Sequence, residues 1–82
     1  MDPDDDWLDP QIAWKDLREA YAEGNLDDME SSAGDLLQWL DEGGFPPQTS
    51  SELPMDEHWN RMIARAGCHF VLQAARHRRA PQ

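Results

Sequence analysis

Apolar and polar residues alternate with the period of an α-helix in the first half of the chain. One such stretch covers residues 10–23 and a second covers residues 26–42, each with an apolar side and an acidic or polar side. Asp9-Pro10 predicts the start of the first helix, because an aspartate caps free backbone amides and a proline fits the first helical position. Gly24-Asn25 predicts the turn between the two, since both residues tolerate the left-handed conformation. The pattern indicates an antiparallel helical hairpin.

The second helix is expected to end at Gly43-Gly44. With Gly44 in the left-handed conformation, Phe45 would fold back onto Leu40. Residues 45–54 then form an internal linker, which Pro46-Pro47 stiffens toward an extended conformation. No stretch of the chain shows the apolar alternation of a β-strand.

A third, longer helix is predicted to begin between Ser51 and Asp56 and to end near Arg79. Placed at about 100° per residue, its side chains fall into three arcs. The largest apolar side chains form the arc that we expect to face the core: Met55, Trp59, Met62, Ile63, Ala66, Phe70 and Ala74. A second arc consists of small apolar residues: Ala64, Gly67, Cys68, Val71 and Ala75. The remaining arc is a basic edge: His58, Arg61, Arg65, His69, Arg76 and Arg79.

The length of 82 residues allows one small domain. The sequence therefore predicts an all-α fold, in which an antiparallel hairpin and a long third helix form a three-helix bundle over residues 9–79. Residues 1–8 and 80–82 are expected to be disordered termini.

Charge is segregated along the chain. All 17 acidic residues lie between Asp2 and Glu57, whereas the segment from His58 onward has five arginines and no acid, and the formal net charge is -10. The basic edge could pair with acids of its own fold or with a partner molecule. We favour the first interpretation, because intramolecular pairing needs no further molecule.

Candidate chemistry is sparse. The single cysteine excludes an internal disulfide, and no apolar run approaches the roughly 20 residues needed to cross a bilayer. The acidic start of the chain lacks a basic leader, so we expect a cytoplasmic protein without membrane association. The spacing of His58, Cys68, His69 and His77 fits no metal motif, and no phosphate-binding loop or nucleophile motif occurs. We therefore expect no metal, no cofactor and no enzymatic activity.

The hairpin region contains an aromatic residue, a leucine, an Ala-Tyr pair, a turn glycine and then small or apolar positions, in this order: Ala13-Trp14, Leu17, Ala20-Tyr21, Gly24-Asn25-Leu26, Met29, Ala33 and Leu36. This order resembles a single tetratricopeptide-type helical hairpin, over residues 10–42. The resemblance implies an αα-hairpin and a protein-binding role, and it supplies no catalytic residues. Arg18 stands where the repeat prefers a small glycine, and no second copy follows.

The third helix has more apolar surface than two short helices can cover. We therefore expect its small-residue arc to be a contact surface, most simply in a homodimer with two-fold symmetry. Trp39 lies about 60° outside the apolar side of the second helix and could be either buried with the core or exposed. It is a further candidate, since exposed tryptophans mark interfaces. The partner-binding residues predicted from the sequence are Trp39, Ala64, Cys68, Val71 and, on the basic edge, Arg61, Arg65 and Arg76.

The sequence thus favours a small non-enzymatic protein–protein interaction module, an adaptor or regulatory subunit, that associates with itself through the third helix. The acidic sides of the first two helices leave a second hypothesis open, an acidic mimic of nucleic acid that inhibits a basic partner protein. Binding of nucleic acid itself is disfavoured by the net charge of -10. Trp7, in the acidic N-terminal segment, could staple the entry to the first helix or dock onto a partner.

Overall fold

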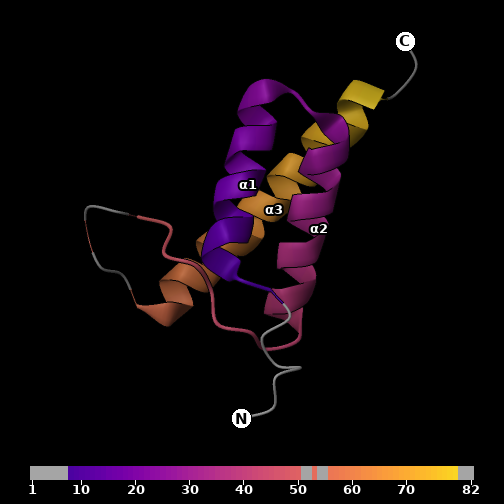
Figure 1. Cartoon of the computed structure of the whole chain (residues 1–82). Coiled ribbons are helices and arrows are strands. Elements are labelled where there is room, and N and C mark those ends of the chain that lie inside the picture. Colours follow the sequence, from indigo (N-terminus) through magenta and orange to yellow (C-terminus); the bar gives the residue numbers. More distant parts are fainter. Residues whose placement is uncertain (1–7, 51–52, 54–55, 80–82) are drawn as a thin grey trace.

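The computed structural model describes residues 8–50, 53 and 56–79, and the regular structure in these residues is helical. Helix α1 spans Pro10–Glu23, α2 spans Leu26–Asp41 and α3 spans Glu57–Arg79. The prediction of an all-α three-helix bundle is confirmed (Figure 1). The bounds of α1 agree with the prediction, and α2 ends one residue earlier than expected.

The helix ends of the hairpin form as predicted. The side chain of Asp9 accepts hydrogen bonds of 3.0 and 3.3 Å from two backbone amides in the first turn of α1. Gly24 ends α1 in the left-handed conformation, with a φ of 73°. The side chain of Asn25 accepts a 3.2 Å hydrogen bond from the amide of Asp28 and so caps α2. These caps satisfy amides that have no partner inside a helix.

The turn after α2 differs from the prediction. Gly43, and not Gly44, has the positive φ, at 93°. Gly44 instead lies against the indole of Trp39, where any Cβ atom would overlap the ring. Phe45 does fold back, and its ring meets Trp39 edge-on at a centroid distance of 6.0 Å, a contact that the prediction with Leu40 did not foresee. The two glycines are therefore needed for different reasons, one for backbone conformation and one for close approach.

The three helices form two layers. α1 and α2 lie side by side in opposite directions, and α3 crosses behind them at an angle (Figure 1). α3 packs mainly along α2 and meets α1 over a shorter stretch. One edge of α3 is therefore closed by α2, while the edge toward α1 is more open.

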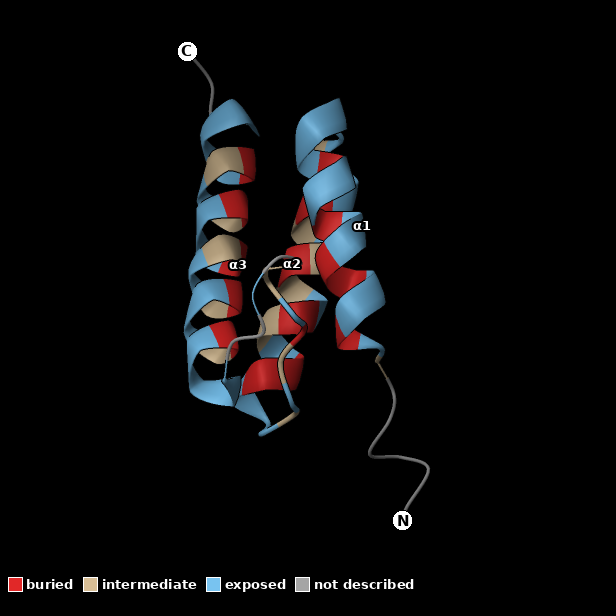
Figure 2. Cartoon of the chain, turned by 90° about the vertical axis from the view of Figure 1, so that its left-hand side faces the viewer, coloured by how far each residue is buried: buried red, intermediate tan, exposed pale blue. Residues whose placement is uncertain are grey.

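The core lies between the hairpin and α3. On the hairpin it contains large apolar side chains, together with alanines: Ala13, Trp14, Leu17, Ala20, Met29, Ala33, Leu36, Trp39 and Leu40. On α3 the buried apolar side chains are the small ones: Ala64, Cys68, Val71 and Ala75. Figure 2 shows the buried side of α3 turned toward the other helices and its exposed side turned outward. The prediction that the large apolar arc of α3 faces the core is wrong for its exposed members, Trp59, Met62, Ile63, Ala66 and Phe70, whereas Ala74 packs partly buried against the core. The small arc, predicted to be a contact surface for another copy, packs against the hairpin instead.

Complementary side-chain volume explains this orientation. The hairpin already supplies bulky residues, so a flat surface on α3 lets the helices approach closely and fill the space between them. Gly67 shows this most directly, because a Cβ atom there would lie 2.7 Å from the ring of Trp14. A large arc facing the hairpin would hold the helices apart. Helical periodicity finds both arcs but does not choose between them.

Hydrogen bonds tie the linker across the end of the bundle. The side chain of Gln11 donates to the backbone oxygen of Gln48 at 3.3 Å, and the amide of Gln48 donates back at 2.9 Å. The buried Asn60 accepts from both the amide and the hydroxyl of Thr49, at 3.1 and 2.9 Å. The linker is thereby fixed to both α1 and α3.

Helix α3 begins at Glu57, one residue after the predicted range of Ser51 to Asp56. The side chain of Asp56 accepts a 2.7 Å hydrogen bond from the amide of Trp59. Leu8, which the sequence placed in the disordered N-terminus, packs half-buried against the core. Trp7, Met55 and the predicted disorder of residues 1–7 and 80–82 lie outside the described residues. Within the described part of the chain, no helix combines the length and apolar character needed to cross a membrane.

Candidate protein-interaction surface

Four of the partner-binding residues predicted from the sequence lie in the core. Ala64, Cys68 and Val71 are on the side of α3 that packs against the hairpin, and the first two have no exposed surface. Trp39 is only 4% exposed. The prediction that these four residues bind a partner is wrong in this fold, because α1, α2 and the linker cover their side chains.

Trp39 closes the core at the end of α2. Its indole N–H donates a 2.8 Å hydrogen bond to the backbone oxygen of Phe45, and Gly44 lies flat against the ring. A buried tryptophan needs such a partner for its single polar group. Trp39 lies beside the apolar side of α2, and its indole contacts Phe45 of the linker. The helix pattern alone could not show that the linker covers this side chain.

Cys68 has the character of a small apolar residue. Burial raises the pKa of its thiol from 9.0 to about 12, while the nearby Arg65 acts in the opposite direction and Asp41 adds slightly to the rise. A thiol held protonated and covered is a poor nucleophile and a poor metal ligand. Within the described residues no group of three or more His, Cys, Asp or Glu side chains could hold a metal ion.

The basic edge of α3 is largely used inside the molecule. Arg65 forms an ion pair with Asp41 at the end of α2. Arg79 pairs with Asp27 at 2.5 Å and Glu30 at 3.1 Å, and the hydrogen bond to Asp27 raises the pKa of Arg79 further. For these arginines the intramolecular interpretation of the charge segregation is confirmed. The pairs lie on the α2 side of α3 and help to set its rotation about its own axis.

Two further arginines of α3, Arg61 and Arg76, differ in their contacts within the molecule. The guanidinium of Arg61 donates a 3.0 Å hydrogen bond to the backbone oxygen of Leu40 and forms a 3.3 Å pair with Glu57. Arg76 is exposed, and no ion pair joins it to any residue that the structure describes. Of the predicted basic partner-binding residues, Arg76 alone is thus left to face solvent without an acidic neighbour in the described chain.

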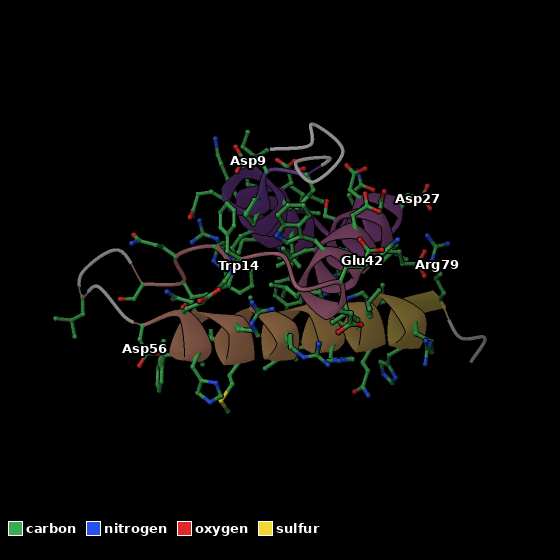
Figure 3. The ribbon with its side chains drawn as sticks, turned by 90° about the horizontal axis from the view of Figure 1, so that it is seen from below. Asp9, Trp14, Asp27, Glu42, Asp56 and Arg79 are labelled. Carbon is green, nitrogen blue, oxygen red and sulfur yellow. The ribbon has the colours of Figure 1, made fainter. Side chains whose placement is uncertain are left out.

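The outer side of α3 carries a row of exposed apolar residues. We call this row the apolar α3 face: Trp59, Met62, Ile63, Ala66 and Phe70. The side chains recur three or four residues apart and so share one side of the helix over about three turns. Trp59, Met62 and Phe70 are 45%, 56% and 58% exposed. Figure 3 shows α3 beneath the hairpin, between Asp56 and Arg79, with side chains projecting from its far side.

The apolar α3 face continues into a groove between α1 and α3. The groove has a volume of about 210 Å³ and is lined by Trp14, Leu17, Arg18, Tyr21, Gly67, Phe70 and Val71. The rings of Phe70 and Tyr21 meet at a centroid distance of 5.4 Å, and the guanidinium of Arg78 lies 5.4 Å from the centre of the Tyr21 ring. The face and the groove together make one apolar surface that spans two helices.

The two ends of the apolar α3 face carry opposite charge. Asp56 and Glu57 precede it, and both are exposed. Arg76 and Arg78 follow it, also exposed, and no acidic residue occurs in α3 after Glu57. Any helix that lies along this face meets an acidic end and a basic end.

Further hollows in the described part of the chain lie away from this surface. One, of about 610 Å³, is formed where the start of α1 meets the linker and is lined by Leu8, Asp9, Pro10, Gln11, Phe45, Pro46, Pro47 and Gln48. Its walls combine apolar side chains with the polar Asp9, Gln11 and Gln48. Another, of about 300 Å³, lies between α1 and α2 and is acidic, lined by Asp16, Glu19, Ala20, Glu23, Asp28 and Ser32.

Comparison with known protein families, curated proteins and solved structures gives no significant match for this chain. The hairpin of α1 and α2 is present, and the resemblance of residues 10–42 to a tetratricopeptide-type hairpin stays a prediction. The candidate surface therefore rests on the geometry of the molecule itself.

Proposed function

We propose that this chain is a protein–protein interaction module whose binding surface is the apolar α3 face. The observation that carries the proposal is that α3 completes the core with its small residues, while its large apolar residues face outward. Contiguous exposed apolar residues with polar surroundings mark interaction sites in proteins. The proposal assigns no enzymatic activity and no cofactor to the chain.

The size of the apolar side chains supports this function. Full burial of a large apolar side chain contributes about 1.5–3 kcal/mol of free energy. Four such side chains are partly exposed: Trp59, Met62, Ile63 and Phe70. A partner that buried the exposed parts would gain several kcal/mol of binding free energy, on the order of one such contribution or more. Tryptophan is among the residues that contribute most at interfaces. An adaptor or regulatory subunit needs such a surface, and the homodimer expected from the sequence is its simplest form.

Site-specific photo-crosslinking in the cells that produce the protein tests this function. A benzoylphenylalanine is placed at position 62 or 70, in the middle of the apolar α3 face. The control position is Ile12, which is 57% exposed but lies on α1, outside the face. We expect protein adducts from positions 62 and 70 and none from position 12. Equal adducts from all three positions, or none from the face, would contradict the proposal.

A second candidate function is supported by the acidic hollow between α1 and α2. Asp16, Glu19, Glu23 and Asp28 line it, and none of them forms an ion pair with a cation in the described residues. An acidic nucleic-acid mimic would bind a basic partner through this side. Photo-adducts in cells would then come from positions 16 and 28, and binding of the purified chain to the captured partner would be lost at about 500 mM salt, where exposed charges are screened.

A further inference from the structure

We propose that the apolar α3 face binds the same face of a second copy, with the two α3 helices antiparallel and crossing at Ala66. The inference rests on the proposed function, because it names the partner of that surface. It also specifies which residues meet, and therefore it can fail while the surface itself stands.

The apolar residues are arranged symmetrically about Ala66. Met62 lies four residues before Ala66 and Phe70 lies four residues after it, on the same side of α3. In an antiparallel pair with its two-fold axis at Ala66, Met62 of each copy meets Phe70 of the other. Ala66 has a short side chain, so the two helices can approach closely where they cross. The same patch then serves both copies, as a closed two-fold interface requires.

The groove between α1 and α3 has an occupant in this arrangement. Ile63 lies three residues before Ala66 and one helical turn before Gly67, the residue that meets Trp14 of α1. The antiparallel register brings Ile63 of the second copy opposite the stretch from Gly67 to Phe70, which forms the α3 wall of the groove. The apolar surface that spans α1 and α3 is thus covered along its length.

The charges at the two ends of α3 select the antiparallel orientation. Asp56 and Arg76 lie at equal distances along the chain from Ala66, on opposite sides of it. An antiparallel pair therefore places the acidic start of each α3 near the basic end of the other, whereas a parallel pair would place Arg76 beside its own copy. The opposed helix dipoles favour the same orientation.

The net charge of -10 on each chain does not prevent this contact. The acidic hollow lies between α1 and α2, whereas the acids on the α2 edge that borders α3, Asp27, Glu30 and Asp41, are paired with arginines of α3. Repulsion between exposed charges is screened beyond about 8 Å at physiological ionic strength. Because α3 has no acidic residue after Glu57, two copies that meet along α3 do not oppose acids over most of its length.

The first test is the mass of the purified chain in solution, measured by light scattering over a series of concentrations. We expect a dimer for the wild type and a monomer for Phe70→Glu, which removes an apolar contact and buries a charge. Ile12→Glu is the matched control, because Ile12 and Phe70 are 57% and 58% exposed, and it should remain a dimer. Circular dichroism checks that the variants stay helical. A monomeric wild type, or a Phe70→Glu dimer, would overturn the proposal.

The second test determines the register by disulfide crosslinking. Met62→Cys and Phe70→Cys are made as separate chains, in which the native Cys68 stays buried. After mixing and mild oxidation, we expect the disulfide between chains to join position 62 of one variant to position 70 of the other, and Ala66→Cys to crosslink with itself. Predominant 62–62 and 70–70 products would show a parallel pair and overturn the antiparallel register.

The two proposals fail in different ways. A monomeric wild type together with photo-adducts of another protein at positions 62 and 70 would leave the interaction surface in place and refute the second copy as its occupant. The absence of adducts from the apolar α3 face together with a monomeric mass would refute both.

Discussion

At the scale of the residue, burial determines what each side chain can do. Cys68 has no exposed surface, and burial raises the pKa of its thiol from 9.0 to about 12. Trp39 has its indole N–H bonded to the backbone oxygen of Phe45 and cannot act as an interface residue. Gly67 is small because the ring of Trp14 occupies the place of a side chain.

The raised pKa of Cys68 predicts a loss of stability in alkaline solution. Because the folded chain holds the thiol proton more tightly than the unfolded chain, the contribution is complete below pH 9.0 and is lost as the pH rises toward 12. We expect the free energy of unfolding to fall in this window by up to about 1.4 kcal/mol per pH unit on account of this group. Urea unfolding of the wild type and of Cys68→Ala measures the effect. The variant should lose this part of the slope, and equal slopes would contradict the prediction.

Gly67→Ala should destabilise the fold, although alanine is the better helix former. The new Cβ atom would lie 2.7 Å from the buried ring of Trp14, and overpacking of this kind costs about 1–3 kcal/mol. Gly34→Ala in α2 is the matched control, because no atom lies within 4 Å of the Cβ position there. It should gain up to about 1 kcal/mol from helix propensity. Opposite signs in thermal unfolding are expected, and a stabilising Gly67→Ala would refute the close contact.

At the scale of the element, the rotation of α3 about its axis is the decisive feature. The small arc faces the hairpin, and the ion pairs of Arg65 and Arg79 hold the neighbouring edge against α2. These ion pairs are exposed and contribute little to stability individually. They favour the same rotation of α3 as the packing of its small residues does, and in this rotation the apolar α3 face points outward.

Asn60 should be the residue that holds the linker to α3. It is buried and accepts two hydrogen bonds from Thr49. Asn60→Ala leaves the Thr49 amide and hydroxyl without this acceptor, so we expect a loss of about 1–3 kcal/mol in the free energy of unfolding. Gln73→Ala, at an exposed position of the same helix, should change it little. Denaturant titration of both variants measures the difference, and equal effects would contradict the role of Asn60.

At the scale of the whole molecule, the acidic residues outnumber the basic ones and repel one another. The 17 acids lie in the first 57 residues, and α3 neutralises only a few of them. We expect the melting temperature to rise between about 10 and about 500 mM salt, because salt screens the repulsion between the acids. Salt also screens the exposed ion pairs, but these contribute little to stability. Thermal unfolding followed by circular dichroism at both salt concentrations measures this change. A lower melting temperature at high salt would show that the ion pairs outweigh the repulsion.

The local signals in the sequence are sufficient to predict the three helices and their ends, and they are insufficient to predict the binding surface. The caps at Asp9, Gly24 and Asn25 act through bonds to neighbouring residues, and each forms as predicted. The binding surface requires a choice between two apolar arcs of one helix. That choice depends on residues far along the chain, above all Trp14, whose ring fits against Gly67.

The sequence by itself determined the three helices, the hairpin turn and the segregation of charge, because these depend on periodicity and on contacts within a few residues. Only the tertiary structure decided which arc of α3 is buried, that Trp39 is covered, and which arginines are paired. These outcomes depend on the fit of volumes and charges between helices, and helical periodicity carries no information about what a neighbouring helix presents. The large apolar residues that the sequence assigned to the core therefore form the apolar α3 face.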